Sequence, residues 1–170
     1  MKAKIPVVFP IFDSIEHTKN QTLSETYSPS FAMTDFEQAK SFLLTYSGND
    51  ATFIAYRRET ERLLHWSWLI AKKSVRDLKR ADIEEYIQFC QDPPIEWIGT
   101  KKASRYVEQE GKRSPNPEWR PFVATVSKVD ARNGQQPSTK NILFRKKQYV
   151  KFLLSQVAFT ISLFKKNILK

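Results

Sequence analysis

The residues that could do chemistry in this chain are mostly cations. Arg57, Arg58 and Arg62 share one side of a predicted helix, and the last two stand one helical turn apart. Two like charges at that spacing repel each other unless an anion is near. Three further basic runs follow along the chain: KKSVRDLKR at 72–80, KKASRY at 101–106 and RKK at 145–147. Lysine and arginine side chains bind phosphate oxygens, so these runs predict a polyanionic partner.

The overall charge favours the same kind of partner. The 170 residues include 28 Lys plus Arg against 18 Asp plus Glu, which gives a net charge of +10. Such an excess favours nucleic acid first and an anionic membrane surface second. Glu59 and Glu61 lie beside arginines on the same predicted helix, and we expect ordinary surface ion pairs from them.

Groups for catalysis or metal binding are sparse. The sequence has one cysteine, Cys90, and two histidines, His17 and His65, which are too few for a zinc site or a Cys–His nucleophile pair. Its four glycines are not spaced as a phosphate-binding loop. We therefore expect no metal, no cofactor and no catalysis by this chain alone. A single cysteine cannot form an internal disulfide, which fits a reducing cytoplasm.

Hydrophobic periodicity predicts an all-α fold, and the first two helices have clear boundary signals. Thr34 and Glu37 have the spacing of a capping box, which predicts a helix start at Thr34. Gly48 is placed to end that helix as a left-handed cap. Asn49 is a good N-cap for the next helix. One face of this second helix forms a mainly apolar stripe, which comprises Phe53, Tyr56, Leu63, Ser67 and Ile70.

The remaining chain divides into helices and irregular segments. A third helix is expected within 78–90, stopped by Pro93 and Pro94, and a last helix over about 139–166. We interpret residues 1–33 as an extended N-terminal arm and residues 34–170 as one helical domain. Within that domain, 91–137 reads as a long, irregular, basic loop. Buried aromatic residues should fix part of the loop to a core, namely Trp97, Trp119 and Phe122.

An ordered series of residues resembles the N-terminal core-binding domain of tyrosine recombinases, the phage integrase family. Thr52, Tyr56 and Arg57 form T-x-x-x-Y-R, and a second pattern, L-x-x-A-D-I-x-x-Y-x-x-F, runs from Leu78 to Phe89. Between the two patterns the series continues with Glu59, Arg62, Leu63 and Trp66. The later DPPIEWIG and EWRPF, and the early IPVVFPIF, are similar to integrases of mobile islands and plasmids.

The resemblance implies a SAM-like bundle of about four helices that forms one half of a clamp around DNA. It places Thr52 and Tyr56 near the DNA backbone, although Tyr56 also fits the apolar core stripe. The family's catalytic domain is absent from this sequence, so a fragment or a truncated member of the family, not catalytic alone, is expected. With the basic runs added, the candidate DNA-contacting residues are Thr52, Tyr56, Arg57, Arg58, Arg62, Lys72, Lys73, Lys101, Lys102 and Arg105.

Two other classes of function stay open on the sequence. The chain could be a protein-interaction module that binds full-length recombinase protomers through its apolar tail. It could also be a peripheral protein that uses its basic, phenylalanine-rich end at a membrane surface. The uncharged stretch 152–164 is too short to span a bilayer. We expect a soluble, cytoplasmic protein with double-stranded DNA as its main partner.

Overall fold

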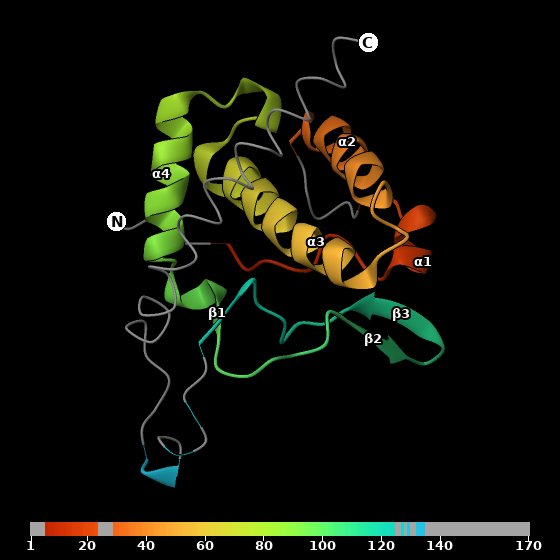
Figure 1. Cartoon of the computed structure of the whole chain (residues 1–170), viewed down its shortest axis with the longest axis vertical. Helices are drawn as coiled ribbons and strands as arrows, with labels where there is room; N and C mark the ends of the chain where they lie inside the picture. The colour runs from red at the N-terminus through yellow and green to blue at the C-terminus, as the bar shows by residue number, and fades with distance from the viewer. Residues whose placement is uncertain (1–5, 24–28, 125–126, 128, 130–131, 135–170) are drawn as a thin grey trace. The chain divides into compact units, whose positions relative to one another are not determined.

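The computed structural model describes residues 6–23 and 29–124, together with 127, 129 and 132–134. The chain divides into two compact units (Figure 1). Among the described residues, the helical unit comprises 11–23 and 29–86, and the hairpin unit comprises 6–10, 87–124, 127, 129 and 132–134. The predicted last helix at 139–166 and the basic run at 145–147 lie outside the described residues.

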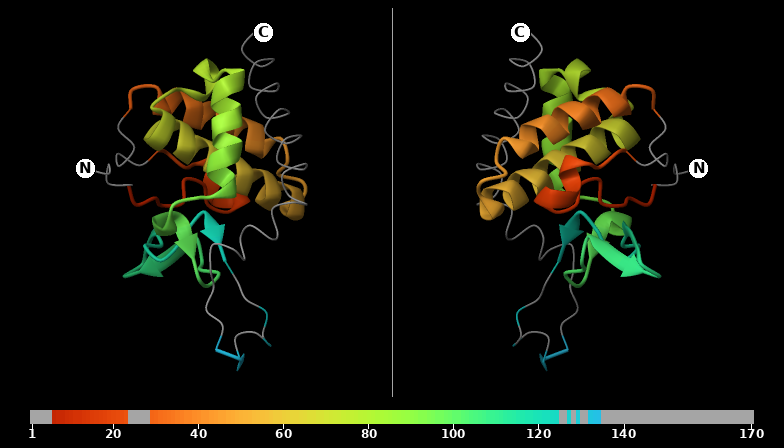
Figure 2. Two further views of the ribbon diagram at one scale, coloured as in Figure 1. Left: turned by 90° about the vertical axis from the view of Figure 1, so that its left-hand side faces the viewer. Right: turned by 90° about the vertical axis from the view of Figure 1, so that its right-hand side faces the viewer.

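Helices make up most of the described part of the helical unit. Its elements, in chain order, are α1 (Ile15–Lys19), α2 (Ala32–Leu44), α3 (Asp50–His65), a π-helical segment (Trp66–Ala71), a short 3₁₀ helix (Val75–Asp77) and the first part of α4 (Arg80–Gln91). Helices α2 and α3 pack side by side (Figures 1 and 2). Among the described residues, none of the helices has the length and apolar character needed to cross a membrane.

Aromatic side chains from distant parts of the sequence form the core of the helical unit. The ring of Phe12 stacks on that of Phe36 with their centroids 5.2 Å apart. Trp66 packs on Tyr86 at 5.4 Å, and Trp68 is fully buried. Phe12 belongs to the predicted N-terminal arm, which also contains helix α1. The predicted N-terminal arm is therefore not only an extended segment, because Phe12 belongs to the core of the helical unit.

The two predicted helix starts have different outcomes. The side chain of Asn49 accepts a hydrogen bond from the Thr52 backbone N–H at 2.9 Å, so the predicted N-cap of α3 is confirmed. The predicted start at Thr34 is wrong, because α2 begins at Ala32, whose N–H donates to the Pro29 carbonyl. This earlier start buries Ala32 and Phe36 one turn apart on the same face.

The predicted left-handed end at Gly48 is also wrong. Helix α2 ends at Leu44, and successive tight turns carry the chain from there to Asn49. A left-handed residue does occur later in the same unit, at Lys72, where φ is 56° and the π-helical segment ends. Ile70, two residues before Lys72, is 39% exposed and does not belong to the core as the apolar stripe predicted.

The all-α prediction is wrong, since the fold is mixed α/β. Strands β2 (Tyr106–Gln109) and β3 (Lys112–Pro115) pair as an antiparallel hairpin within the predicted loop 91–137 (Figure 2). The turn residues Glu110 and Gly111 both have positive φ, at 53° and 73°. Two such residues give the turn twist that suits a two-residue hairpin. An E-G pair between polar segments was too weak a signal to predict strands.

A second, smaller strand pair and several buried aromatic residues also belong to the hairpin unit. Strands β1 (Ile98–Gly99) and β4 (Phe122–Val123) pair in parallel. Trp97 lies in a 3₁₀ turn (Ile95–Trp97), and its indole N–H donates to the Pro6 carbonyl at 3.0 Å. The prediction that aromatic residues fix this region is confirmed by the burial of Trp97, Trp119 and Phe122.

Shortening Leu63 tests the helical core. Leu63 is 2% exposed on α3, so Leu63→Ala should lower the free energy of unfolding by about 2–5 kcal/mol. The exposed Ile70 provides the control, and Ile70→Ala should change stability by less than about 1 kcal/mol. Urea midpoints of the two variants measure the difference. Equal losses would show that the side of α3 assigned to the core is wrong.

Candidate nucleic-acid interface

The arginines of α3 are held by a buried carboxylate. Glu59 is only 5% exposed. It accepts a hydrogen bond from Arg58 Nε at 2.7 Å and from Arg62 Nη1 at 3.2 Å. Glu59 is thus the anion that relieves repulsion between Arg58 and Arg62. The prediction of an ordinary surface ion pair is wrong for Glu59, because its side chain is buried. These two arginines are part of the fold before any partner binds.

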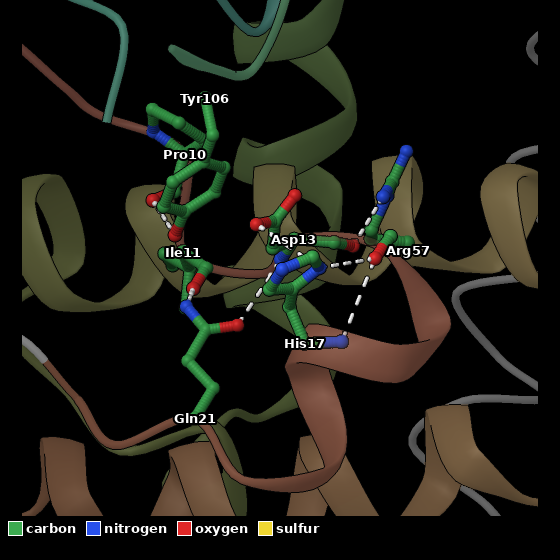
Figure 3. Close-up of polar contacts among 8 residues, drawn as sticks. Pro10, Ile11, Asp13, His17, Gln21, Arg57 and Tyr106 are labelled. Atoms are coloured by element: carbon green, nitrogen blue, oxygen red, sulfur yellow. Dashed lines mark hydrogen bonds and ion pairs between the residues drawn. The ribbon is translucent and has the colours of Figure 1, made fainter. Parts of the chain in front are cut away.

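Arg57 binds the N-terminal segment of the helical unit. Its Nη1 donates to the Asp13 carbonyl (Figure 3). Its guanidinium also lies 5.5 Å from the centre of the Phe53 ring. An open cavity of about 240 Å³ adjoins it, lined by Ser14, Ile15, Glu16, Asp50, Phe53, Ile54 and Arg57. With two carboxylates on its rim, this cavity does not suit phosphate.

The same segment brings a serine, a histidine and an aspartate together. Ser14 Oγ lies 2.8 Å from His17 Nδ1, and Asp13 Oδ2 lies 3.9 Å from the same nitrogen. A catalytic relay needs the two partners on opposite ring nitrogens. Ser14 also caps α1 by accepting from the His17 backbone N–H. These contacts give the group a helix-capping role.

Thr52 and Tyr56 lie on α3 as the predicted series requires, and both are half-buried. The Tyr56 ring is 4.5 Å from that of Tyr46 and 5.6 Å from that of Phe42. Burial raises the pKa of Tyr46, and the neighbouring hydroxyl of Tyr56 raises it further. Tyr56 therefore contributes to an aromatic cluster, in agreement with its place in the apolar stripe.

Most of the exposed cations in the described part of the helical unit lie in residues 72–80, which we call the basic turn. It joins the π-helical segment to α4 and carries five cations and one acidic residue, Asp77. All five cations are exposed, namely Lys72, Lys73, Arg76, Lys79 and Arg80. Arg76, Lys79 and Arg80 were absent from the candidate residues, although the run KKSVRDLKR contains them.

A buried aspartate holds the backbone of the basic turn. Asp35, on α2, is 1% exposed. Its carboxylate accepts hydrogen bonds from Ser74 Oγ at 2.6 Å and from the Val75 N–H at 2.9 Å. It also accepts one from the Trp68 indole N–H at 2.9 Å. No local sequence signal pointed to Asp35, because its partners lie 33 to 40 residues further along the chain.

A second aspartate holds the other end of the turn. Asp82 accepts from the Lys79 backbone N–H at 2.8 Å and from Lys73 Nζ at 2.6 Å. The hydrogen bond to Lys73, followed by that to Lys79, lowers the pKa of Asp82. The same bond to Asp82 raises the pKa of Lys73. Lys73 therefore remains cationic across the neutral range.

Some cations of the basic turn form ion pairs with acidic side chains, and others do not. Lys73 is paired with Asp82, and Arg80 is paired with Glu84 at 3.0 Å. No ion pair is found for Lys72, Arg76 or Lys79 within the described ranges. These three side chains can meet an anion without first breaking an ion pair of that kind.

Two of the three predicted cations of the hairpin unit already contact other side chains of the chain. Lys101 pairs with Glu118 at 2.8 Å, a contact that lowers the pKa of the Glu118 carboxyl. Arg105 stacks on the Trp119 ring at 4.7 Å, and Lys102 is exposed. The predicted residues thus fall into separate groups. Seven lie on α3 and the basic turn of the helical unit, and the other three lie in the hairpin unit.

Comparison with known proteins adds no assignment to this geometry. Neither protein-family models nor curated proteins nor solved structures gave a match to the chain. In the part of the chain that the structure describes, no group of three or more His, Cys, Asp or Glu side chains could hold a metal ion.

Proposed function

We propose that this chain binds duplex DNA, with the basic turn as its main phosphate-binding element. The observation that carries the proposal is a run of five exposed cations on a backbone held by Asp35 and Asp82. A surface that is already ordered loses less conformational entropy when it binds. Phosphate contacts by such cations release counterions from DNA, which makes the binding strongly dependent on salt.

The backbone of the turn gives additional support. Lys72 adopts a left-handed conformation at the end of a π-helical segment. Left-handed non-glycine residues and π-helical segments are uncommon, and both concentrate at functional sites. Phosphate contacts fix position rather than sequence, so the proposed binding is largely independent of base sequence.

The more specific proposal is that the chain is the DNA-binding part of an integrase-like tyrosine recombinase and is not catalytic alone. Its support is the ordered residue series from Thr52 to Phe89, which spans α3, the basic turn and α4. The hairpin unit is a departure from the all-α domain that the resemblance implied. In this proposal, Lys72 and Lys73 bind phosphate, while Arg58 and Arg62 mainly hold Glu59.

Removing the three cations without ion pairs tests DNA binding. The variant Lys72→Ala with Arg76→Ala and Lys79→Ala should reduce the slope of log K against log salt by about 3, since each phosphate contact contributes about 0.9. Fluorescence anisotropy with two duplexes of unrelated sequence, at several salt concentrations, measures the slope. The loss should be similar for both duplexes.

A second triple variant, which removes the same number of positive charges, provides the control. Lys101→Ala with Lys102→Ala and Lys112→Ala removes three exposed cations from the hairpin unit. It should change the slope less than the variant of the basic turn. Equal effects would assign binding to net charge alone. Absence of salt-dependent binding by the unaltered chain would exclude the proposed function.

A further inference from the structure

We propose that Asp82 competes with DNA for Lys73 and so limits the affinity of the basic turn. This inference rests on the proposed function, and it concerns one ion pair within that site. The Lys73 ammonium lies 2.6 Å from Asp82 Oδ1, while its side chain is 45% exposed. A phosphate oxygen can therefore reach Lys73, but it must take the place of the carboxylate.

The position of Asp82 makes this competition persistent. Its side chain is only 10% exposed, and its other oxygen accepts from the Lys79 N–H directly before α4. An acidic side chain in the first turn of a helix that bonds back to the preceding N–H is one half of a capping box. The bond to the Lys79 N–H holds the carboxylate at the start of the helix. When DNA arrives, Asp82 remains as a negative charge beside the incoming phosphate.

The Arg80–Glu84 pair differs in this respect. Its two side chains are 94% and 60% exposed, so either can move into solvent. Highly exposed pairs of this kind contribute little and are easily replaced. Of these two acidic residues beside the basic turn, Asp82 is therefore the one that keeps a cation from DNA, and Lys73 contributes less than a full phosphate contact.

Asp82→Asn is the decisive variant. An asparagine oxygen can still accept from the Lys79 N–H, but the amide carries no charge to hold Lys73. The variant should bind duplex DNA about threefold more tightly at low salt. Its slope of log K against log salt should be steeper by up to about 1, the value of one additional phosphate contact.

Two comparisons separate this effect from the simple loss of a negative charge. Asp77→Asn removes an exposed acidic charge from the same turn, and no ion pair is found for Asp77 among the described residues. It should tighten binding less than Asp82→Asn. In a Lys73→Ala background, Asp82→Asn should have no more effect than Asp77→Asn. Equal effects in the unaltered chain, or an undiminished effect without Lys73, would overturn the inference.

A second measurement covers the case in which Asp82→Asn does not fold. Lys73→Ala should reduce the salt slope less than Lys72→Ala, because Lys73 is paired with Asp82 while no ion pair is found for Lys72 among the described residues. Equal reductions would also overturn the inference. The proposed function is tested separately. If the unaltered chain shows no salt-dependent DNA binding, the proposed function itself is wrong. If that binding is present and these comparisons show no difference, only the role of Asp82 falls.

Discussion

Replacing Asp35 with alanine is expected to lower the free energy of unfolding by about 3–5 kcal/mol. The carboxylate is 1% exposed and accepts from the Trp68 indole, the Ser74 hydroxyl and the Val75 N–H. Removing an acceptor from several buried donors makes them lose hydrogen bonds to a charged group, each of which contributes about 1.5–3 kcal/mol. The structure around the missing carboxylate can relax in part, so the total loss of stability is smaller than the sum of the three hydrogen-bond contributions. A loss of this size is a large fraction of the stability of a typical domain.

Two further variants sharpen the test of Asp35. Asp35→Asn retains one acceptor oxygen and should lose about half as much stability. Asp50→Ala removes an exposed acidic residue from the first turn of α3 and should cost about 0.3–1 kcal/mol, the contribution of a charge near a helix dipole. Urea unfolding followed by tryptophan fluorescence gives all three values. If Asp35→Ala is no more damaging than Asp50→Ala, Asp35 does not hold the basic turn.

Replacing Glu61 with leucine should cost about 2–4 kcal/mol. Glu61 is 1% exposed, and its Oε1 accepts from the backbone N–H groups of Ile11 and Phe12, the latter at 3.2 Å. Leucine has a similar volume but no acceptor, so both N–H groups lose this partner in a buried place. Because Phe12 stacks on Phe36, the loss should extend from the backbone of the N-terminal segment into the core.

Hydrogen exchange locates the effect of Glu61. The amides of Ile11 and Phe12 should exchange faster in Glu61→Leu than in the unaltered chain. Glu61→Gln keeps an acceptor oxygen and should retain most of the stability and protection. Exposed Glu84, on α4, is the control, and Glu84→Leu should change stability by less than about 1 kcal/mol. Unchanged exchange at Ile11 and Phe12 in the leucine variant would contradict the capping role.

The sequence alone predicted the features that depend on neighbouring residues. Asn49 caps α3 because its side chain reaches an N–H only three residues away. Helix α4 was expected within 78–90, and it spans Arg80–Gln91 before Pro93 and Pro94. Such signals act over one helical turn, which hydrophobic periodicity and capping preferences describe well. The run KKSVRDLKR likewise marked the basic turn directly.

Tertiary structure decided what depends on distant partners. Glu59 and Glu61 share one short run of α3, and the sequence predicted surface ion pairs for both. The fold instead buries Glu59 against two arginines and Glu61 against a backbone 49 to 50 residues earlier. Asp35 acquired its partners in the same way. A buried carboxylate is stable only when donors surround it, and the tertiary fold supplies those donors. The short strands within 98–123 also depend on partners elsewhere in the chain. Strand pairing and turn geometry form them, and the local hydrophobic periodicity does not predict them.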